Sequence, residues 1–233
     1  MFKASSEFAR ASDEAKSALL AALTRRTYAN NEVVYLQEDE AQQLYFVVSG
    51  HIRLSYVRDD GSAILYAILP PGDSFGELGI FDGGVHCDMA MGIGNAVVGS
   101  VSARKFSALR ERFPNLQKCI ALLVAQRYRS YIELTRMMSI KTLQGRVAQA
   151  LLGLADGLGT EAIHCGRKVP SVGPVVSQSD LGLMARGARN SVNRILKIWE
   201  RAGWLAIKDR SILIVNRAAI EASALRSATS QMV

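Results

Sequence analysis

One stretch of the sequence, residues 176–205, restricts the possible folds more than any other. It contains two short helical patterns separated by a glycine-bearing corner. In the second pattern an apolar residue recurs every three or four positions, which places all of them on one side of a helix. These residues are Val192, Ile195, Leu196 and Trp199. The second pattern therefore predicts a helix with one buried stripe.

The face opposite this stripe carries arginine and asparagine near the start of the helix. The four residues are Arg189, Asn190, Asn193 and Arg194. Arginine and asparagine offer paired hydrogen-bonding groups that match the edges of guanine and adenine in the major groove. An apolar back combined with such a front predicts a helix that reads DNA sequence.

The first of the two helices has its own start signal. Ser177 is a favourable N-cap residue, and Asp180 follows three positions later, which is close to a capping box. Gly187 is expected to adopt the unusual backbone angles of the corner. The pair at 202–203, Ala-Gly, is expected to end the second helix.

Two β-prone runs, residues 204–207 and 212–215, follow the helices and flank a polar, partly basic tip at 208–211. This pattern predicts a short β-hairpin, so that the whole unit is a winged helix-turn-helix. The competing interpretation is an ordinary buried helical hairpin with solvated charges. That interpretation requires three independent features to coincide by accident.

The positive charge of the chain is concentrated in the same half. The formal net charge is +7; residues 139–233 contain 13 Lys and Arg against 6 Asp and Glu, whereas residues 1–138 contain 15 of each. Neutralising phosphates requires this local placement, so double-stranded DNA is the expected partner. No apolar run approaches the length of a membrane span, and no membrane partner is expected.

Other classes of site have little support in the sequence. The three cysteines and three histidines are dispersed, so no metal site is expected. We find no nucleophile elbow or phosphate-binding lysine loop, and we expect no catalytic residues and no enzyme activity. Without a secretion signal at the start, the default localisation is cytoplasmic.

The residue pattern of the first half predicts a helical segment over residues 1–27 and β-structure after it. Short apolar runs separated by turns predict a small antiparallel barrel. The expected strands lie at 33–35, 44–48, 52–56, 64–69, 89–93 and 96–101, and the expected turns at 38–40, 49–50, 58–61 and 70–73. A long helix is then predicted from Pro114 to Met138, with apolar residues on more than one side, which must both be buried. Residues 222–233 are expected to form a loose tail.

Three segments in this order resemble the Crp/Fnr superfamily of bacterial transcription regulators. They are LYFVVSGHIRL at 44–54, PPGDSFGELGIF at 70–81, and the helix-turn-helix. The resemblance extends from about Tyr28 to Val215. It implies an α+β fold: an N-terminal antiparallel β-roll of jelly-roll type over residues 1–113, a long dimerisation helix over 114–138, and a C-terminal winged helix-turn-helix over 139–233.

The resemblance also implies a ligand pocket. Gly76, Glu77 and Leu78 are similar to the start of the family's phosphate-binding cassette, where backbone N–H groups receive a cyclic phosphate and the Glu holds the ribose. In cAMP-responsive members the cassette ends with Arg-Ser or Arg-Thr, whereas Cys87 and Asp88 stand here. Asp88 places a negative charge beside the anion, and no arginine is available locally. Losing a charge-assisted bond costs roughly 1.5–3 kcal/mol, which argues against ordinary cAMP binding.

Several alternatives for this pocket stay open. The segment is either a vestigial cassette, a site for an unrelated ligand, a site for a modified nucleotide or a nucleotide or cyclic dinucleotide effector, or a contact for a partner protein. No cofactor is certain. Tyr131 and Ile132 replace the Thr-Ser pair that touches adenine in cAMP-responsive members. A redox role for Cys87 is disfavoured, because its neighbours His86 and Asp88 have opposing effects. The candidate pocket residues are Gly76, Glu77, Leu78, Cys87, Asp88, Arg127 and Tyr131.

In this family one side of the long helix packs on the β-roll and the other forms a coiled coil with a second subunit, which implies a homodimer. The candidate interface residues are Leu116, Ile120, Val124, Tyr128, Tyr131 and Leu134. A single-subunit helix, packed only within the monomer, is the alternative. RNA polymerase is the further partner that the resemblance implies.

The candidate DNA contacts divide into two groups. Arg189 and Arg194 are candidates for guanine, and Asn190 and Asn193 for adenine or phosphate, while backbone positioning falls to Ser177, Gln178, Ser191 and Lys197. The usual family pattern has Ser and Glu where Ala188 and Asn190 stand, so the preferred operator should differ from the family half-site. The alternative function is a small-ligand receptor that acts through protein partners and has a degenerate DNA-binding half. The charge asymmetry argues against it.

Overall fold

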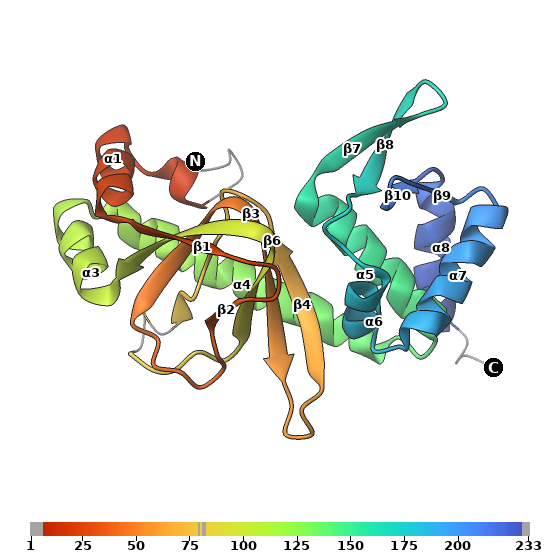
Figure 1. Cartoon of the computed structure of the whole chain (residues 1–233), viewed down its shortest axis with the longest axis horizontal. Coiled ribbons are helices and arrows are strands. Elements are labelled where there is room, and N and C mark those ends of the chain that lie inside the picture. The colour runs from red at the N-terminus through yellow and green to blue at the C-terminus, as the bar shows by residue number, and fades with distance from the viewer. Residues whose placement is uncertain (1–6, 79, 81–82, 230–233) are drawn as a thin grey trace. The chain divides into compact units, whose positions relative to one another are not determined.

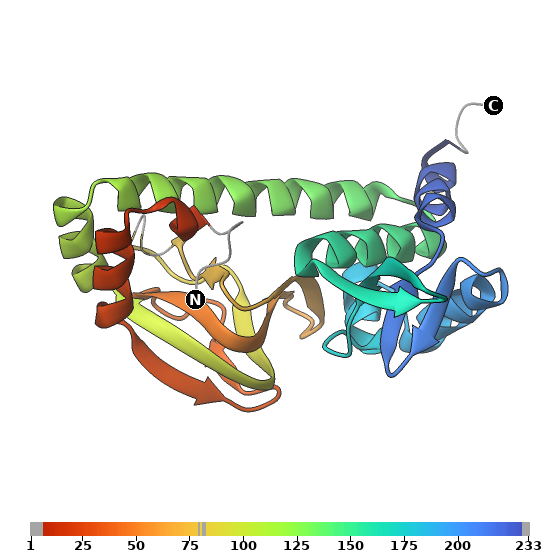
Figure 2. The same cartoon turned by 90° about the horizontal axis from the view of Figure 1, so that it is seen from above.

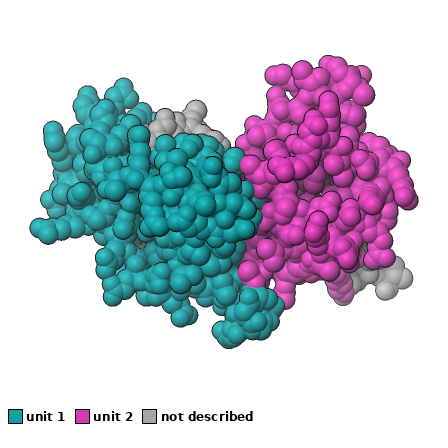
Figure 3. All heavy atoms as spheres, viewed as in Figure 1, with its two compact units in different colours: residues 1–62, 67–131 teal, residues 63–66, 132–233 magenta. Residues whose placement is uncertain are grey.

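The computed structural model describes residues 7–78, 80 and 83–229. The chain divides into two compact units, residues 1–62 with 67–131 and residues 63–66 with 132–233 (Figure 3). The division falls within the longest helix, α4 (Asn115–Ser139). Each unit has its own core, and the two are described in turn.

The first unit is built on a six-stranded sheet in the order β1-β6-β3-β4, with β2 added to β6 and β5 to β3 (Figure 1). The pairings of β6 with β1, β2 and β3 are antiparallel, and so is that of β3 with β5. The chain enters the sheet through η1 (Glu7–Arg10) and α1 (Asp13–Ala22), whose N-cap is Ser12, as expected. The strands are β1 (Thr24–Tyr28), β2 (Val33–Tyr35), β3 (Gln43–Val57), β4 (Ala63–Leu69), β5 (Ser74–Phe75) and β6 (Met89–Ser102).

Several predicted boundaries in this sheet are wrong. Residues 49–50, predicted as a turn, form an irregularity within β3, where the register with β6 shifts on both sides of Ser49. Gly50 has φ +73°, and a Cβ there would lie 2.6 Å from Ala96 Cα, so the strand continues through a glycine-dependent bulge. Residues 89–93 and 96–101 likewise form one strand, β6. Residues 24–27, predicted as helical, form β1, because pairing with β6 outweighs local helical pattern.

Three helices, α1, α3 (Ala103–Arg112) and the first half of α4, cover one face of this sheet (Figure 2). Phe8, Phe46 and Phe106 form the centre of the core between them, with edge-to-face ring contacts. Leu116 and Ile120 of α4 are completely buried in the same core. The expectation that these two residues belong to a dimer interface is wrong, because they pack within the chain.

The second unit begins with α5 (Leu143–Leu158) and contains a four-stranded sheet in the order β7-β8-β10-β9. Its strands are β7 (Thr160–His164), β8 (Arg167–Val172), β9 (Leu205–Lys208) and β10 (Ser211–Ile214), and its other helices are α6 (Gln178–Ala185), α7 (Arg189–Arg201) and α8 (Arg217–Thr229). Helix α5 packs against α6, α7 and α8.

The predicted tail is wrong for residues 222–229, which belong to α8; residues 230–233 lie outside the described part of the chain. Arg217, at the start of α8, donates one hydrogen bond to each carboxylate oxygen of Asp156 in α5, at 2.6 and 2.9 Å. Ile220 is completely buried. Arg217 and Ile220, which hold the start of α8 in its unit, thus precede residues 222–233, the stretch whose composition suggests a tail.

Candidate nucleic-acid interface and ligand pocket

The helix-turn-helix begins with a complete capping box. The Ser177 Oγ accepts a hydrogen bond from the Asp180 backbone N–H at 3.1 Å, and the buried Asp180 carboxylate accepts one from the Ser177 backbone N–H at 2.8 Å. Two of the otherwise unpaired donors at the start of α6 are therefore satisfied. The prediction of this start from sequence is confirmed.

The corner between α6 and α7 differs from the prediction in one respect. Arg186, rather than Gly187, adopts the left-handed conformation, with φ 51°. A Cβ at Gly187 would lie 2.3 Å from Leu143 Cδ1, so the end of that side chain would have to shift. The α6 glycine, Gly182, is more strictly restricted, because its Cβ would lie 2.6 Å from the Gly187 carbonyl oxygen, a backbone atom. Close packing of the corner against α5 and α6 explains both glycines.

Helix α7 has the predicted division into two faces. Val192, Leu196 and Trp199 are completely buried, and Ile195 is half-buried. On the other side Arg189, Asn190, Arg194 and Lys197 are exposed, while Ser191 and Asn193 are half-buried. This is the surface that a helix needs in order to enter a major groove while remaining anchored to its domain.

The two helices are also joined by polar contacts. Gln178 of α6 donates a long hydrogen bond, 3.5 Å, from Nε2 to the Asn193 Oδ1 of α7. The N-cap of α7, Ala188, makes no side-chain hydrogen bond, as its residue type implies. Among the predicted contact residues, Gln178 and Asn193 are therefore brought together, one from each helix.

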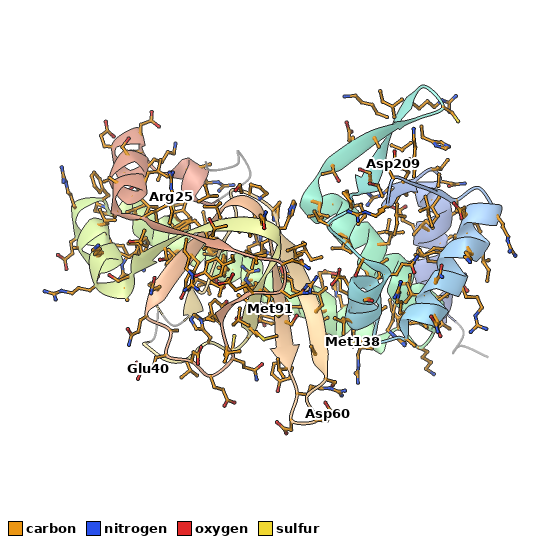
Figure 4. All side chains as sticks on the ribbon, in the orientation of Figure 1. Arg25, Glu40, Asp60, Met91, Met138 and Asp209 are labelled. Atoms are coloured by element: carbon orange, nitrogen blue, oxygen red, sulfur yellow. The ribbon has the colours of Figure 1, made fainter. Side chains whose placement is uncertain are left out.

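The wing is a tight hairpin between β9 and β10. Its two turn residues, Asp209 (labelled in Figure 4) and Arg210, have φ 50° and 61°. Two consecutive residues with positive φ are typical of the two-residue turns that match the twist of a hairpin. Lys208 and Arg210 are exposed at this tip. The sequence indicates a partly basic tip there, but these two cations are not among the predicted contacts.

Arg146 of α5 is a structural residue and is not among the predicted contacts. Its Nε donates to the Ala185 carbonyl at 2.7 Å, and its Nη1 donates to the Ile140 and Lys141 carbonyls at 2.9 and 3.0 Å. A single guanidinium thus satisfies carbonyls at the end of α6 and in the segment before α5. It fixes the helix-turn-helix to the start of α5.

A second candidate site lies in the first unit, around the segment that resembles a phosphate-binding cassette. Its cavity has a volume of only about 10 Å³, which is room for about one water molecule. It is lined by Gly76, Glu77, Leu78, His86, Cys87, Asp88 and Tyr131. Six of the seven predicted pocket residues therefore line one cavity, and the seventh, Arg127, binds one of them.

Both acidic side chains of this cavity have partners within the chain. Glu77, 3% exposed, forms an ion pair with Arg127, 8% exposed, at 3.2 Å between Oε1 and Nε. Arg127 also donates from Nη2 to the Ser74 carbonyl at 3.0 Å. The arginine that pairs with Glu77 is not local in sequence, because Arg127 lies 50 residues away.

Asp88 accepts a hydrogen bond from the Tyr35 hydroxyl at 2.8 Å. The Tyr35 ring stacks on His86, with centroids 3.6 Å apart and planes 8° apart. Burial, together with the charge of Asp88, raises the pKa of Tyr35 well above its ordinary value, so its hydroxyl remains a donor. Burial lowers the pKa of His86, which favours the neutral ring. These side chains fill the space at the end of the cassette.

The Cys87 Sγ lies 3.5 Å from the Tyr131 hydroxyl. Burial raises the pKa of the Cys87 thiol, whereas a reactive cysteine needs a lowered pKa. In the described part of the chain, no group of three or more His, Cys, Asp or Glu residues is arranged to hold a metal ion. Over the same residues, no helix is long and apolar enough to cross a membrane.

Comparisons with known proteins match both units. A model of the cyclic nucleotide-binding domain matches residues 25–113, and a model of the Crp-like helix-turn-helix domain matches residues 145–223. The chain is 26% identical over 199 residues to a CRP-like cAMP-activated global transcriptional regulator of Mycobacterium tuberculosis, covering 84% of this chain and 87% of that protein.

Solved structures show the same architecture. A CRP-family transcriptional regulator of Thermus thermophilus has a TM-score of 0.68 at 27% identity, covering 85% of this chain and 96% of that one. FixK2 from Bradyrhizobium japonicum has a TM-score of 0.74 at 23% identity, covering 86% and 96%, and shares the fold.

Proposed function

We propose a specific mode of action for this chain, which belongs to the Crp/Fnr superfamily of bacterial transcription regulators and is a DNA-binding regulator. It acts as a homodimer on a near-palindromic operator, and its sensor pocket does not take ordinary cAMP. The observation that carries DNA reading is the face of α7 on which Arg189, Asn190 and Arg194 are exposed opposite a completely buried stripe. A degenerate DNA-binding half would not need to keep this division.

The proposed dimer forms through residues 114–138, on the side of α4 that does not pack on the sheet. Val124 and Leu134 are half-buried there, and Tyr128 is 66% exposed. Tyr131, also half-buried, lies beside them and lines the cassette cavity as well. Two tyrosines and two aliphatic residues beside one another are an apolar surface of the kind that a partner covers. Two-fold symmetry then places the two α7 helices in half-sites about one helical turn of DNA apart. RNA polymerase is the proposed further partner, in the cytoplasm.

Both the residue types and the small space of the cassette pocket disfavour binding of cAMP. Relatives such as the M. tuberculosis regulator are named as cAMP-activated. Here Cys87 and Asp88 stand where the cAMP-responsive pattern has arginine and a hydroxyl residue, and the cavity has room for about one water molecule. The two carboxylates of the cavity, Glu77 and Asp88, already have partners in Arg127 and Tyr35. We therefore infer a protein that binds its operator without cAMP; a nucleotide or cyclic dinucleotide effector stays an open proposal.

A titration of cAMP tests this part of the proposal. We expect no saturable heat in calorimetry and less than about a twofold change in operator affinity, since each tenfold change in affinity requires about 1.4 kcal/mol of ligand-dependent free energy. The M. tuberculosis relative, treated identically, is the positive control. A tenfold or larger cAMP-dependent gain in operator affinity would contradict the proposal.

Replacing one exposed side chain of α7 by alanine tests the DNA contacts. Arg189→Ala should weaken operator binding by roughly 1–3 kcal/mol and relax the sequence preference at one base pair, because a bidentate contact to guanine is lost. Arg201→Ala, at the exposed last position of the same helix, is the matched control with the same change of charge. Competition binding against operators substituted one base pair at a time measures both effects. Equal weakening on all sequences would show that Arg189 contacts phosphate only.

A further inference from the structure

The first unit contains a second, larger cavity that is separate from the cassette. It is an open groove of about 440 Å³ on the β1-β6-β3 part of the sheet, extended by residues from α1, β2 and α3. The volume lies in the range that holds small-molecule ligands. None of its lining residues is shared with the cavity of about 10 Å³ described above.

The register of the three strands brings the groove residues together. Side chains alternate along a strand, so Arg26 and Tyr28 lie on one face of β1, and Ser100 and Ser102 on one face of β6. Tyr45 of β3 is paired with Ser100. The neighbouring residues Leu44, Phe46 and Val101 point to the other face, into the core. The groove is therefore the polar counterpart of a well-packed apolar face, on a rigid base.

The charge in this groove is of one sign. Its lining contains two cations, Arg26 from β1 and Lys105 from α3, and no carboxylate. Arg26 is held in place, because its guanidinium lies 4.8 Å above the Tyr28 ring and its Nη2 donates to Glu32, outside the lining, at 3.0 Å. Lys105 is exposed. Because Glu32 already pairs with Arg26, Lys105 is the lining cation that favours an anionic group.

The remaining lining groups favour a hydroxyl-bearing ligand. Serine and threonine hydroxyls and a glutamine amide, at Thr24, Gln43, Ser100 and Ser102, can donate and accept hydrogen bonds. Burial raises the pKa of Tyr28, and burial with the neighbouring Tyr28 raises the pKa of Tyr45 to about 12. Both phenols are therefore neutral donors at physiological pH.

We propose that this groove is a binding site for a small, hydroxyl-rich organic anion of the sugar-phosphate class. The phosphate group contacts Lys105, and the sugar hydroxyls contact the hydroxyls of β1 and β6. The site shares no residue with the proposed DNA contacts, so it can be tested by binding alone.

Nuclear magnetic resonance titration of the whole protein with glucose 6-phosphate and ribose 5-phosphate tests the proposal, with glucose and inorganic phosphate as comparators. At least one sugar phosphate should bind with a Kd of about 1 mM or tighter, shift the backbone signals of Ser100 and Ser102, and bind more tightly than either comparator. Lys105→Ala should weaken that binding about tenfold, the loss expected for one charge-assisted contact.

Arg104→Ala is the matched control, because Arg104 precedes Lys105, is exposed and does not line the groove. It removes the same charge and should change the Kd by less than about twofold. Three results would overturn the proposal: no saturable binding of either sugar phosphate, binding no tighter than that of inorganic phosphate, or equal weakening by Arg104→Ala and Lys105→Ala.

Discussion

Replacing Tyr128 by glutamate should convert the dimer into a monomer and weaken operator binding by about 100-fold or more. Tyr128 is 66% exposed and lies between Val124 and Tyr131 on the apolar side of α4. In a two-fold dimer the substitution occurs twice, so two like charges are brought into one apolar contact, where unpaired charges are costly. A monomer also loses the second half-site, and linkage of two sites contributes about 10²–10⁴ in affinity.

Sedimentation velocity on the ligand-free protein measures the first effect, and a gel-shift titration with a selected operator measures the second. Gln126→Glu is the control: it adds the same charge at another exposed position, almost on the opposite side of α4. It should leave the dimer intact. If the Tyr128→Glu protein remained a dimer at the same concentration as the wild type, the surface assigned to α4 would be wrong.

Arg127→Ala should lower the free energy of unfolding by roughly 3–5 kcal/mol, because it leaves the buried Glu77 carboxylate without its cation. The Ser74 carbonyl loses a donor in the same variant. Most of the expected cost is thus that of an isolated buried charge rather than of one hydrogen bond. Urea unfolding, followed by a signal specific to the first unit, measures it.

The double variant Glu77→Gln with Arg127→Met separates charge from packing. It removes both charges and keeps most of the volume, so it should be clearly more stable than Arg127→Ala alone. If Arg127→Ala cost less than about 1 kcal/mol, the pair would be no more important than a surface ion pair. The Glu77–Arg127 contact would then no longer support a cassette pocket whose charged groups are paired within the chain.

The parts of the fold that are predictable are those that local sequence determines. The stripe of Val192, Leu196 and Trp199 follows from helical periodicity, and the start of α6 follows from the capping chemistry of Ser177 and Asp180. The hairpin of the wing follows from two β-prone runs around a polar tip. Each signal lies within a dozen residues, where sequence spacing and spatial distance agree.

The parts that local pattern misses depend on contacts between distant segments. Gly50 looks like a turn residue until its neighbour Ala96 is known, and Gly187 like a corner residue until Leu143 is known. The Glu77–Arg127 pair joins positions 50 residues apart. Apolar pattern alone also does not tell which side of a long helix meets its own chain, and for this reason it places Leu116 and Ile120 wrongly at a dimer interface.

Selection of ligand-free protein on a randomised DNA library tests the central claim most directly, because it presupposes neither an operator sequence nor an effector. The account predicts enrichment of a near-palindrome whose half-sites lie about 10 base pairs apart, centre to centre, with sequence preferences that change in the Arg189→Ala variant. Binding without any enriched sequence, uniform across the library and lost as salt is raised, would contradict it.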